Sequence, residues 1–249
     1  MSGHSKWNNI QHRKGAQDQK RAKLFTKFGR EIAVAAKEAG GDPNFNPRLR
    51  LAIEKAKAGN MPKDALERAI KKGTGELDGA EYVELRYEGY GPAGTAFIVD
   101  TLTDNKNRTA SEVRSTFTRR GGNLGTDGAV SWMFKKRGSI SLKAAGLDPD
   151  QVMMDALEAG AEDVKEEEGY FEIITDPADF QSVVDALKTG GYEYEEAEIE
   201  MYAENRVPIG DFDTAKSVMG MFEALDDLDD VQEVWSNFDI PDDLLEKLE

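Results

Sequence analysis

Three glycines at positions 73, 75 and 79 separate two parts of the chain that have different hydrophobic periods. Before them, apolar residues recur at the spacing of an amphipathic helix, and after them apolar and charged residues alternate as they do in strands. One regular element type cannot satisfy both periods. We therefore predict a helical N-terminal part, a hinge at the glycines, and a body that mixes strands with helices.

The N-terminal part is predicted to hold three helices. The first runs from about Ala16, with its apolar residues on one side; on the opposite side, open to phosphate or water, lie Lys20, Lys23, Lys27, Arg30 and Lys37. Asn46 and Pro47 predict the start of a second helix, and Met61–Pro62 that of a third, ending at Gly73. The two short helices also permit a helix-turn-helix interpretation, but their spacing is generic.

The body is predicted to contain an inserted unit. Residues 138 to 203 read as strand 139–142, helix 149–160, strand 163–167, strand 170–175, a helix opened by Asp176–Pro177, and strand 193–202. This β-α-β-β-α-β order is typical of a ferredoxin-like sandwich. The tail offers only strand 206–209, helix 214–225 and strand 231–235, too few strands for a domain. We pair it with the segment before the insertion.

That earlier segment is predicted to contain strands 81–88 and 95–102, a helix that ends at Gly121, and strand 129–134. Thr109 and Glu112 read as a capping box at the start of the helix.

Charge is divided unevenly along the chain. The first 37 residues hold nine Lys/Arg against two acidic residues; residues 1–79 carry a net +8 and residues 80–249 a net −24, within a total of −16. Phosphate attracts such a basic head while the acidic body repels it, so nucleic acid is the leading class of partner. A solvated basic helix without a ligand is the alternative.

Composition excludes several other functions. The chain has no cysteine, which removes disulfides, thiolate nucleophiles and cysteine-based metal sites. His4 and His12 are its two histidines and lack a metal-binding frame, so no metal or cofactor is expected. The longest apolar run has five residues, and the N-terminus lacks the apolar region of a signal peptide. We expect a soluble, cytoplasmic protein with no membrane partner, no small-molecule substrate and no enzymatic activity.

Two further segments carry possible contacts. Trp7 stands among cations in an apolar-poor N-terminal arm, where its indole could stack on a base or simply pack on the bundle. Residues 103–128 form a basic island in the acidic body, and their glycines favour turns over a phosphate loop. The acidic run 226–230 lacks the pattern of a calcium loop and reads as a solvated face. A hydrolase built on body carboxylates is the least favoured function.

Three long motifs carry a family resemblance. They are GHSKWNNIQHRKGAQDQKRAKLFTK at 3–27, NMPKDALERAIKKGTGE at 60–76 and LTDNKNRTASEVRSTFTRRGGNLGTDGAVSWMF at 102–134, and together they resemble the YebC/PmpR family. Ala93 departs from the usual Gly-Pro-Gly-Gly turn of that family. The resemblance implies three domains, with the third inserted in the second, and nucleic-acid binding without catalysis. Its members include probable bacterial transcriptional regulators and a mitochondrial translational activator.

Together these observations predict an α+β fold: an N-terminal helical bundle (residues 1–79), a central α/β domain (80–134 plus 204–249) and an inserted ferredoxin-like domain (135–203). The predicted function is regulation of gene expression, either as a DNA-binding transcriptional regulator at promoters or as a translation factor that binds messenger or ribosomal RNA and relieves ribosomes at difficult sequences such as proline runs. The candidate nucleic-acid contacts are Lys6, Trp7, His12, Arg13, Lys14, Lys20, Arg21, Lys23, Lys27, Arg30, Lys106, Arg108, Arg114, Arg119 and Arg120.

Overall fold

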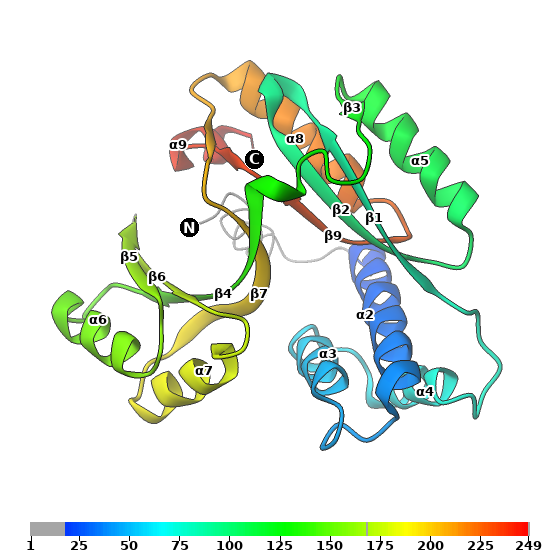
Figure 1. The fold of residues 1–249 in the computed structure, drawn as a ribbon, viewed down its shortest axis with the longest axis horizontal. Coiled ribbons are helices and arrows are strands. Elements are labelled where there is room, and N and C mark those ends of the chain that lie inside the picture. Colours follow the sequence, from blue (N-terminus) through cyan, green and yellow to red (C-terminus); the bar gives the residue numbers. More distant parts are fainter. Residues whose placement is uncertain (1–17, 168, 249) are drawn as a thin grey trace.

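The computed structural model describes residues 18–167 and 169–248. Its elements form an α+β fold with three separate groups of helices and strands, as predicted (Figure 1). One group is all-helical, and each of the other two is built on a four-stranded antiparallel sheet.

The head is a bundle of α2 (Asp18–Ala39), α3 (Pro47–Ala58) and α4 (Lys63–Gly73). Asn46 caps α3 as predicted: its side chain accepts a hydrogen bond from the Leu49 amide, and Pro47 is the first helical residue. The last residue of α4 is a glycine because a Cβ at position 73 would lie 2.3 Å from the carbonyl oxygen of Ala33 in α2. The absence of a side chain therefore lets α4 pack directly on α2.

The central sheet has the strand order β3-β1-β2-β9, formed by β3 (Asn123–Leu124), β1 (Val83–Tyr90), β2 (Ala96–Thr103) and β9 (Val231–Ser236). A short 3-10 turn, η1 (Pro92–Gly94), joins β1 to β2. Helices α5 (Lys106–Arg119) and α8 (Phe212–Asp226) cover one face, where their apolar residues meet Phe97 and Val99 of β2 in a common core. Beside it, β8 (Val207–Pro208) pairs in parallel with β10 (Phe238–Asp239), and α9 (Asp242–Lys247) ends the described chain.

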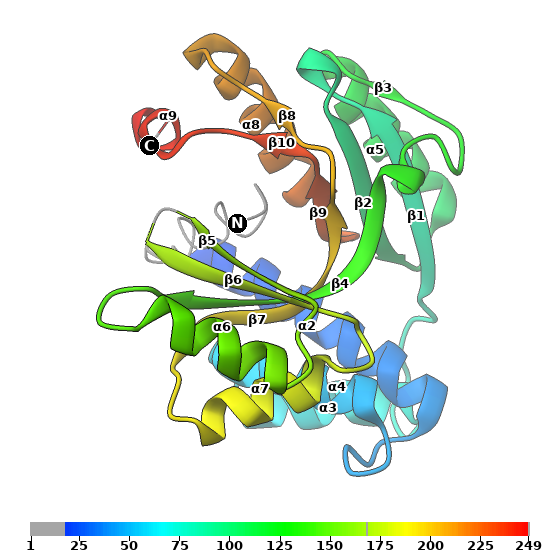
Figure 2. The same ribbon diagram turned by 60° about the vertical axis from the view of Figure 1, so that its left-hand side comes forward.

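The inserted sheet has the order β5-β6-β4-β7, all antiparallel: β5 (Asp163–Glu167), β6 (Tyr170–Thr175), β4 (Phe134–Lys143) and β7 (Tyr194–Ala203). Helices α6 (Pro149–Glu158) and α7 (Phe180–Thr189) pack on one face of it (Figure 2). This is the strand order of a ferredoxin-like sandwich, as the sequence pattern predicted. A smaller core containing Phe134, Ala203 and Trp235 joins this unit to the free face of the central sheet.

We propose that these three groups correspond to the domains 1–79, 80–134 plus 204–249, and 135–203.

Two local predictions were wrong. The segment 129–134 is not a strand: it holds a 3-10 turn, η2 (Ser131–Met133), because its apolar residues cover the free face of the central sheet, and β4 begins only at Phe134. Thr109 does not cap α5, because Asn105 does so by accepting from the Arg108 amide, and the Thr109 hydroxyl is buried in another network.

Candidate nucleic-acid interface

The predicted contact residues fall into three groups. Lys6, Trp7, His12, Arg13 and Lys14 lie outside the described residues, as does the side chain of Lys20. The remaining cations of the head lie on α2, and those of the basic island lie on and directly after α5. The structure therefore describes two groups of predicted contacts, and their surroundings differ.

The cationic face of α2 lies against the acidic segment 226–230, which links α8 to β9. The Lys23 ammonium donates to the main-chain oxygen of Asp227 at 2.9 Å and lies 3.4 Å from its carboxylate; Lys27 is 2.6 Å from the Asp226 carboxylate. Arg30 reaches deepest, with a nitrogen 3.0 Å from the Asp230 carboxylate and hydrogen bonds to the main-chain oxygens of Asp229 and Leu102. Three consecutive turns of the helix thus bind one short stretch of the body.

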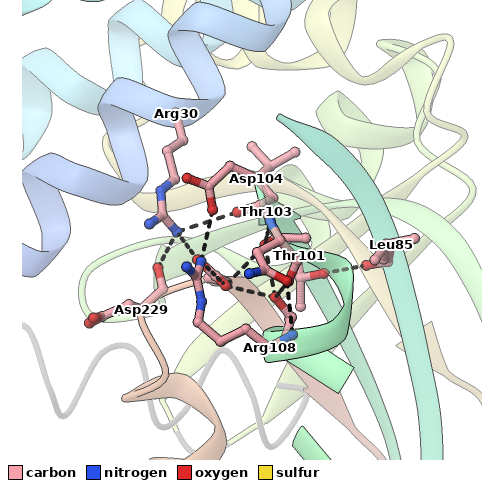
Figure 3. Close-up of polar contacts among 11 residues, drawn as sticks. Arg30, Leu85, Thr101, Thr103, Asp104, Arg108 and Asp229 are labelled. Carbon is pink, nitrogen blue, oxygen red and sulfur yellow. Dashed lines mark hydrogen bonds and ion pairs between the residues drawn. The ribbon is translucent and has the colours of Figure 1, made fainter. Parts of the chain in front are cut away.

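Asp230 is the centre of this contact, and its side chain is only 2% exposed. Figure 3 shows its partners Arg30, Arg108 and Thr103 directed toward one another. Its carboxylate accepts hydrogen bonds from the hydroxyls of Thr103 at 3.0 Å and Thr109 at 2.7 Å, and from the Arg108 guanidinium at 2.8 Å. Burial acts to raise the pKa of Asp230, but these donors, together with the charge of Arg30, outweigh it and hold the pKa below its usual value. Asp230 is therefore a charged group held in place by α5 and β2.

Two sequence predictions about this region were wrong. The cationic face of α2 is not open at Lys27 and Arg30, whereas Lys23 contacts Asp227 but stays 47% exposed, and the run 226–230 is not simply a solvated face. No sequence pattern indicates these contacts, because the pairs join residues about 200 positions apart. Contact between these cations and nucleic acid stays a prediction. Arg21 is exposed and forms no ion pair with the described residues.

The cations of the basic island divide differently. Arg108 pairs with Asp230 and Asp104, and the hydrogen bonds that its guanidinium donates to these carboxylates raise its pKa further. Four others are exposed and make no ion pair with any residue in 18–167 or 169–248: Lys106, Arg114, Arg119 and Arg120. The guanidinium of Arg120 lies near Gly220 of α8. These four exposed cations, which we call the cationic strip, are spread along and directly after α5 and around its exposed face, on a body that is otherwise strongly acidic.

The glycine-rich loop after α5 holds a carboxylate of the protein itself. Glu88, only 6% exposed, accepts hydrogen bonds from the backbone amides of Gly128 at 3.0 Å, Val130 at 2.8 Å and Ser131 at 2.8 Å. Burial alone would raise the pKa of Glu88, but these amides lower it below the usual value. Because the amides are already occupied, the loop serves as a turn, as predicted, and not as a phosphate cradle.

A row of carboxylates on β7 was missed from the sequence. Glu196, Glu198 and Glu200 alternate along the strand and so share one face of the inserted sheet. Lys55 of α3 reaches this row, 3.8 Å from Glu198 and 2.5 Å from Glu233 of β9. The pKa of Lys55 is raised, chiefly by Glu233. Burial, and then repulsion from Glu198 and Glu200, raises the pKa of Glu196 to about 8.

These carboxylates do not form a metal centre. Among the described residues, no group of three or more His, Cys, Asp or Glu side chains is arranged to hold a metal ion. None of the described helices has both the length and the apolar character that a membrane span requires.

Comparisons with known proteins agree with the three-part fold. Residues 5–76 match the model of the TACO1/YebC protein N-terminal domain, and residues 82–238 match that of the TACO1/YebC second and third domain. Together these matches cover most of the chain. The chain therefore belongs to the TACO1/YebC family.

Individual relatives align along their full length. A probable transcriptional regulatory protein, FN1661, from Fusobacterium nucleatum is 73% identical over 249 residues, with both chains covered completely. A probable transcriptional regulatory protein, GSU1074, from Geobacter sulfurreducens is 55% identical over 248 residues, again with both chains covered completely. Among solved structures, the conserved hypothetical protein Aq1575 from Aquifex aeolicus superposes with a TM-score of 0.79 at 47% identity, over 90% of this chain and 92% of that one.

Proposed function

We propose that this protein is a non-enzymatic, nucleic-acid-binding regulator of gene expression that acts in the cytoplasm, with DNA as the first candidate target. The names of its full-length relatives support a role in transcription. The observation that carries the proposal is the cationic strip on α5. Its four exposed cations are not engaged by any carboxylate of the described chain, although acidic residues outnumber basic ones in this protein by 48 to 32.

A strip of this kind suits a phosphodiester backbone. Lys106, Arg114 and Arg119 are spread from the first to the last residue of α5, a helix of 14 residues and about 20 Å in length. At about 100° per residue Arg114 and Arg119 lie on opposite edges of its exposed face, so they can contact phosphates on both sides of the helix. The acidic surroundings repel phosphate elsewhere on the body, so they orient the bound strand towards this helix. Such contacts supply affinity without reading sequence.

RNA is the second candidate, with ribosomal or messenger RNA as the target of a translation factor that relieves stalling at proline runs. The observation that favours it concerns α4, the helix that would enter the major groove if the head were a helix-turn-helix unit. The cations of its first two turns pair within the helix, Lys63 with Glu67 and Arg68 with Asp64, whereas Lys71 and Lys72 lie in the last turn. The N-terminal part of a recognition helix directs donors at base edges, and the two cations in that part of α4 are paired with carboxylates of the same helix.

Catalysis is not part of the proposal. The two histidines lie outside the described residues, and the β7 carboxylates are engaged in part by Lys55. A raised pKa like that of Glu196 also arises in structural charge clusters. A hydrolase built on these carboxylates remains the least favoured alternative.

Crosslinking in cells, followed by sequencing of the bound DNA and RNA, tests the proposal. Peaks at promoters would support the transcriptional role, while enrichment of ribosomal RNA without promoter peaks would support the second candidate. In vitro, labelled duplex DNA and single-stranded RNA should bind with an affinity that falls steeply with salt. Absence of both from the crosslinked material, with no binding at low salt in vitro, would refute the proposal.

A further inference from the structure

The contact between the head and the central part of the body is held by charges. The apolar core of α2, α3 and α4 consists, among the described residues, only of side chains between positions 25 and 70. The links to the body include Lys23, Lys27 and Arg30 with segment 226–230, and Arg48 with Glu84. Lys55 with Glu233 is a further link of this kind. The exposed pairs, such as Lys23 with Asp227, weaken with salt, whereas the buried contact of Arg30 with Asp230 is screened less and has to be displaced by a competing polyanion.

Segment 226–230 is placed by the body and not by the head. Asp230 is fixed by Thr103, Thr109 and Arg108, all of which belong to the central sheet or to α5. Removal of α2 would therefore leave the acidic segment in its present place. The acidic segment is a preformed surface, and α2 is the element that can leave it.

The positions of Asp226 and Asp227 are unfavourable within α8 itself. They are the last residue and the C-cap of this helix, where the negative end of the helix dipole repels carboxylates, and the last turn of α8 has no basic residue. The opposing charges come from α2, through Lys27 and Lys23. The local cost is thus offset by the contact between the two parts, which indicates that these aspartates serve that contact.

We propose that segment 226–230 is an internal competitor for nucleic acid, one that occupies the phosphate-binding face of α2 until a nucleic acid displaces it. This inference rests on the proposed function. Carboxylate and phosphate oxygens bind ammonium and guanidinium groups in the same way, so both can use the same three cations. A strand captured first on α5 raises the local concentration of phosphate near α2 and opens the head from the body. While segment 226–230 covers α2, the affinity for nucleic acid is lower, because the internal ion pairs must break before phosphate can bind.

The test is the double variant Asp226→Asn and Asp227→Asn, which removes the competitor and leaves every cation in place. It should bind a fluorescein-labelled 30-nucleotide duplex DNA or single-stranded RNA about fivefold more tightly at low salt, since two partly exposed ion pairs no longer oppose binding. The matched control is Glu158→Gln with Glu246→Gln. It removes the same charge from two exposed residues that have no ion pair with the described chain, and should change the affinity less than about twofold.

Separation of the head from the body is measured in a second experiment. Because the chain has no cysteine, Lys63→Cys on the head and Ser217→Cys on α8 give a unique pair of labels for energy transfer, away from the proposed contacts on α5. Added oligonucleotide should lower the transfer efficiency of the labelled protein with the native segment 226–230. The double aspartate variant should begin at a lower efficiency than that protein, because Arg30 with Asp230 still holds part of the contact. If the parent and the control bind nucleic acid but the aspartate variant binds no more tightly, or the labels do not separate, the inference is overturned while the proposed function stands. If neither form binds any nucleic acid, the proposed function falls, and the inference with it.

Discussion

Helices α2 and α5 have similar cationic surfaces in the sequence but opposite situations in the structure. On α2, Lys23, Lys27 and Arg30 are engaged by one acidic segment of the body. On α5, the exposed Lys106, Arg114 and Arg119 have no such partner among the described residues. The number of cations on a helix therefore does not measure their availability to phosphate. Availability depends on which carboxylates the fold brings beside them.

The largest effect is expected at Asp230, where the two helices meet. Asp230→Ala leaves Arg30 and Arg108 without their shared buried partner and deprives two threonine hydroxyls of an acceptor. Loss of one member of a buried ion pair should lower the free energy of unfolding by about 3 kcal/mol, as measured by urea denaturation. Asp229→Asn is the matched control, because Asp229 binds Arg30 through its main-chain oxygen. Equal losses in the two variants would show that Asp230 is not the anchor.

The second effect compares the two helices directly. Arg114→Gln with Arg119→Gln should weaken nucleic-acid binding about tenfold and lower the slope of log affinity against log salt by about 1.4 to 1.8. Lys23→Gln with Lys27→Gln removes two contacts but also two internal pairs that binding must break, so its loss should be smaller. Fluorescence anisotropy over a salt series measures both. A larger loss from the α2 pair would reverse the comparison.

Much of the fold follows from short-range patterns in the sequence. The helical period, Asn46–Pro47 and the glycine at position 73 predict α3 and α4 closely, and the β-α-β-β-α-β pattern predicts the inserted sheet. The short strands β3 and β10 were missed because two residues carry no period, and η2 was mistaken for a strand because apolar residues in a covering turn resemble one.

The candidate site was less predictable than the fold. The cations of α2 and α5 stand out in the sequence, but their partners depend on contacts such as Lys23 with Asp227, 204 residues away. The hydrogen bond from the Gly128 amide in the glycine-rich loop to the Glu88 carboxylate likewise joins residues far apart in the chain, 40 positions in this case. The hydrophobic period of a segment carries no information about ion pairs with distant residues. Whether a charged residue is available to phosphate therefore has to be determined from the structure.

A third effect, on stability, concerns two carboxylates with opposite surroundings. Backbone amides lower the pKa of Glu88, whereas burial and neighbouring glutamates raise that of Glu196 to about 8, above its unfolded value of about 4.5. Between pH 4.5 and about pH 8, folded Glu196 holds a proton that the unfolded chain has released. The stabilisation from this bound proton is therefore lost as pH rises towards 8. Glu196→Gln should raise the melting temperature at pH 8.5 by a few degrees and flatten its decline from pH 6 to 9. The exposed Glu193→Gln should leave the decline unchanged; an equally steep decline in Glu196→Gln would contradict the shift.

The smallest effect is expected at the far end of α2, where Lys37 pairs with Glu81 at 2.9 Å. The two side chains are 54% and 86% exposed, so water and salt screen their attraction, and side-chain entropy opposes it. Lys37→Gln should therefore change neither the melting temperature nor the energy transfer between head and body to a measurable degree. This near-silent variant removes one charge from α2, as a single change at Lys27 would, but it does so away from segment 226–230. If it opened the head as far as Asp226→Asn with Asp227→Asn does, the total charge of α2 would hold the head in place, and the acidic segment would lose its special role.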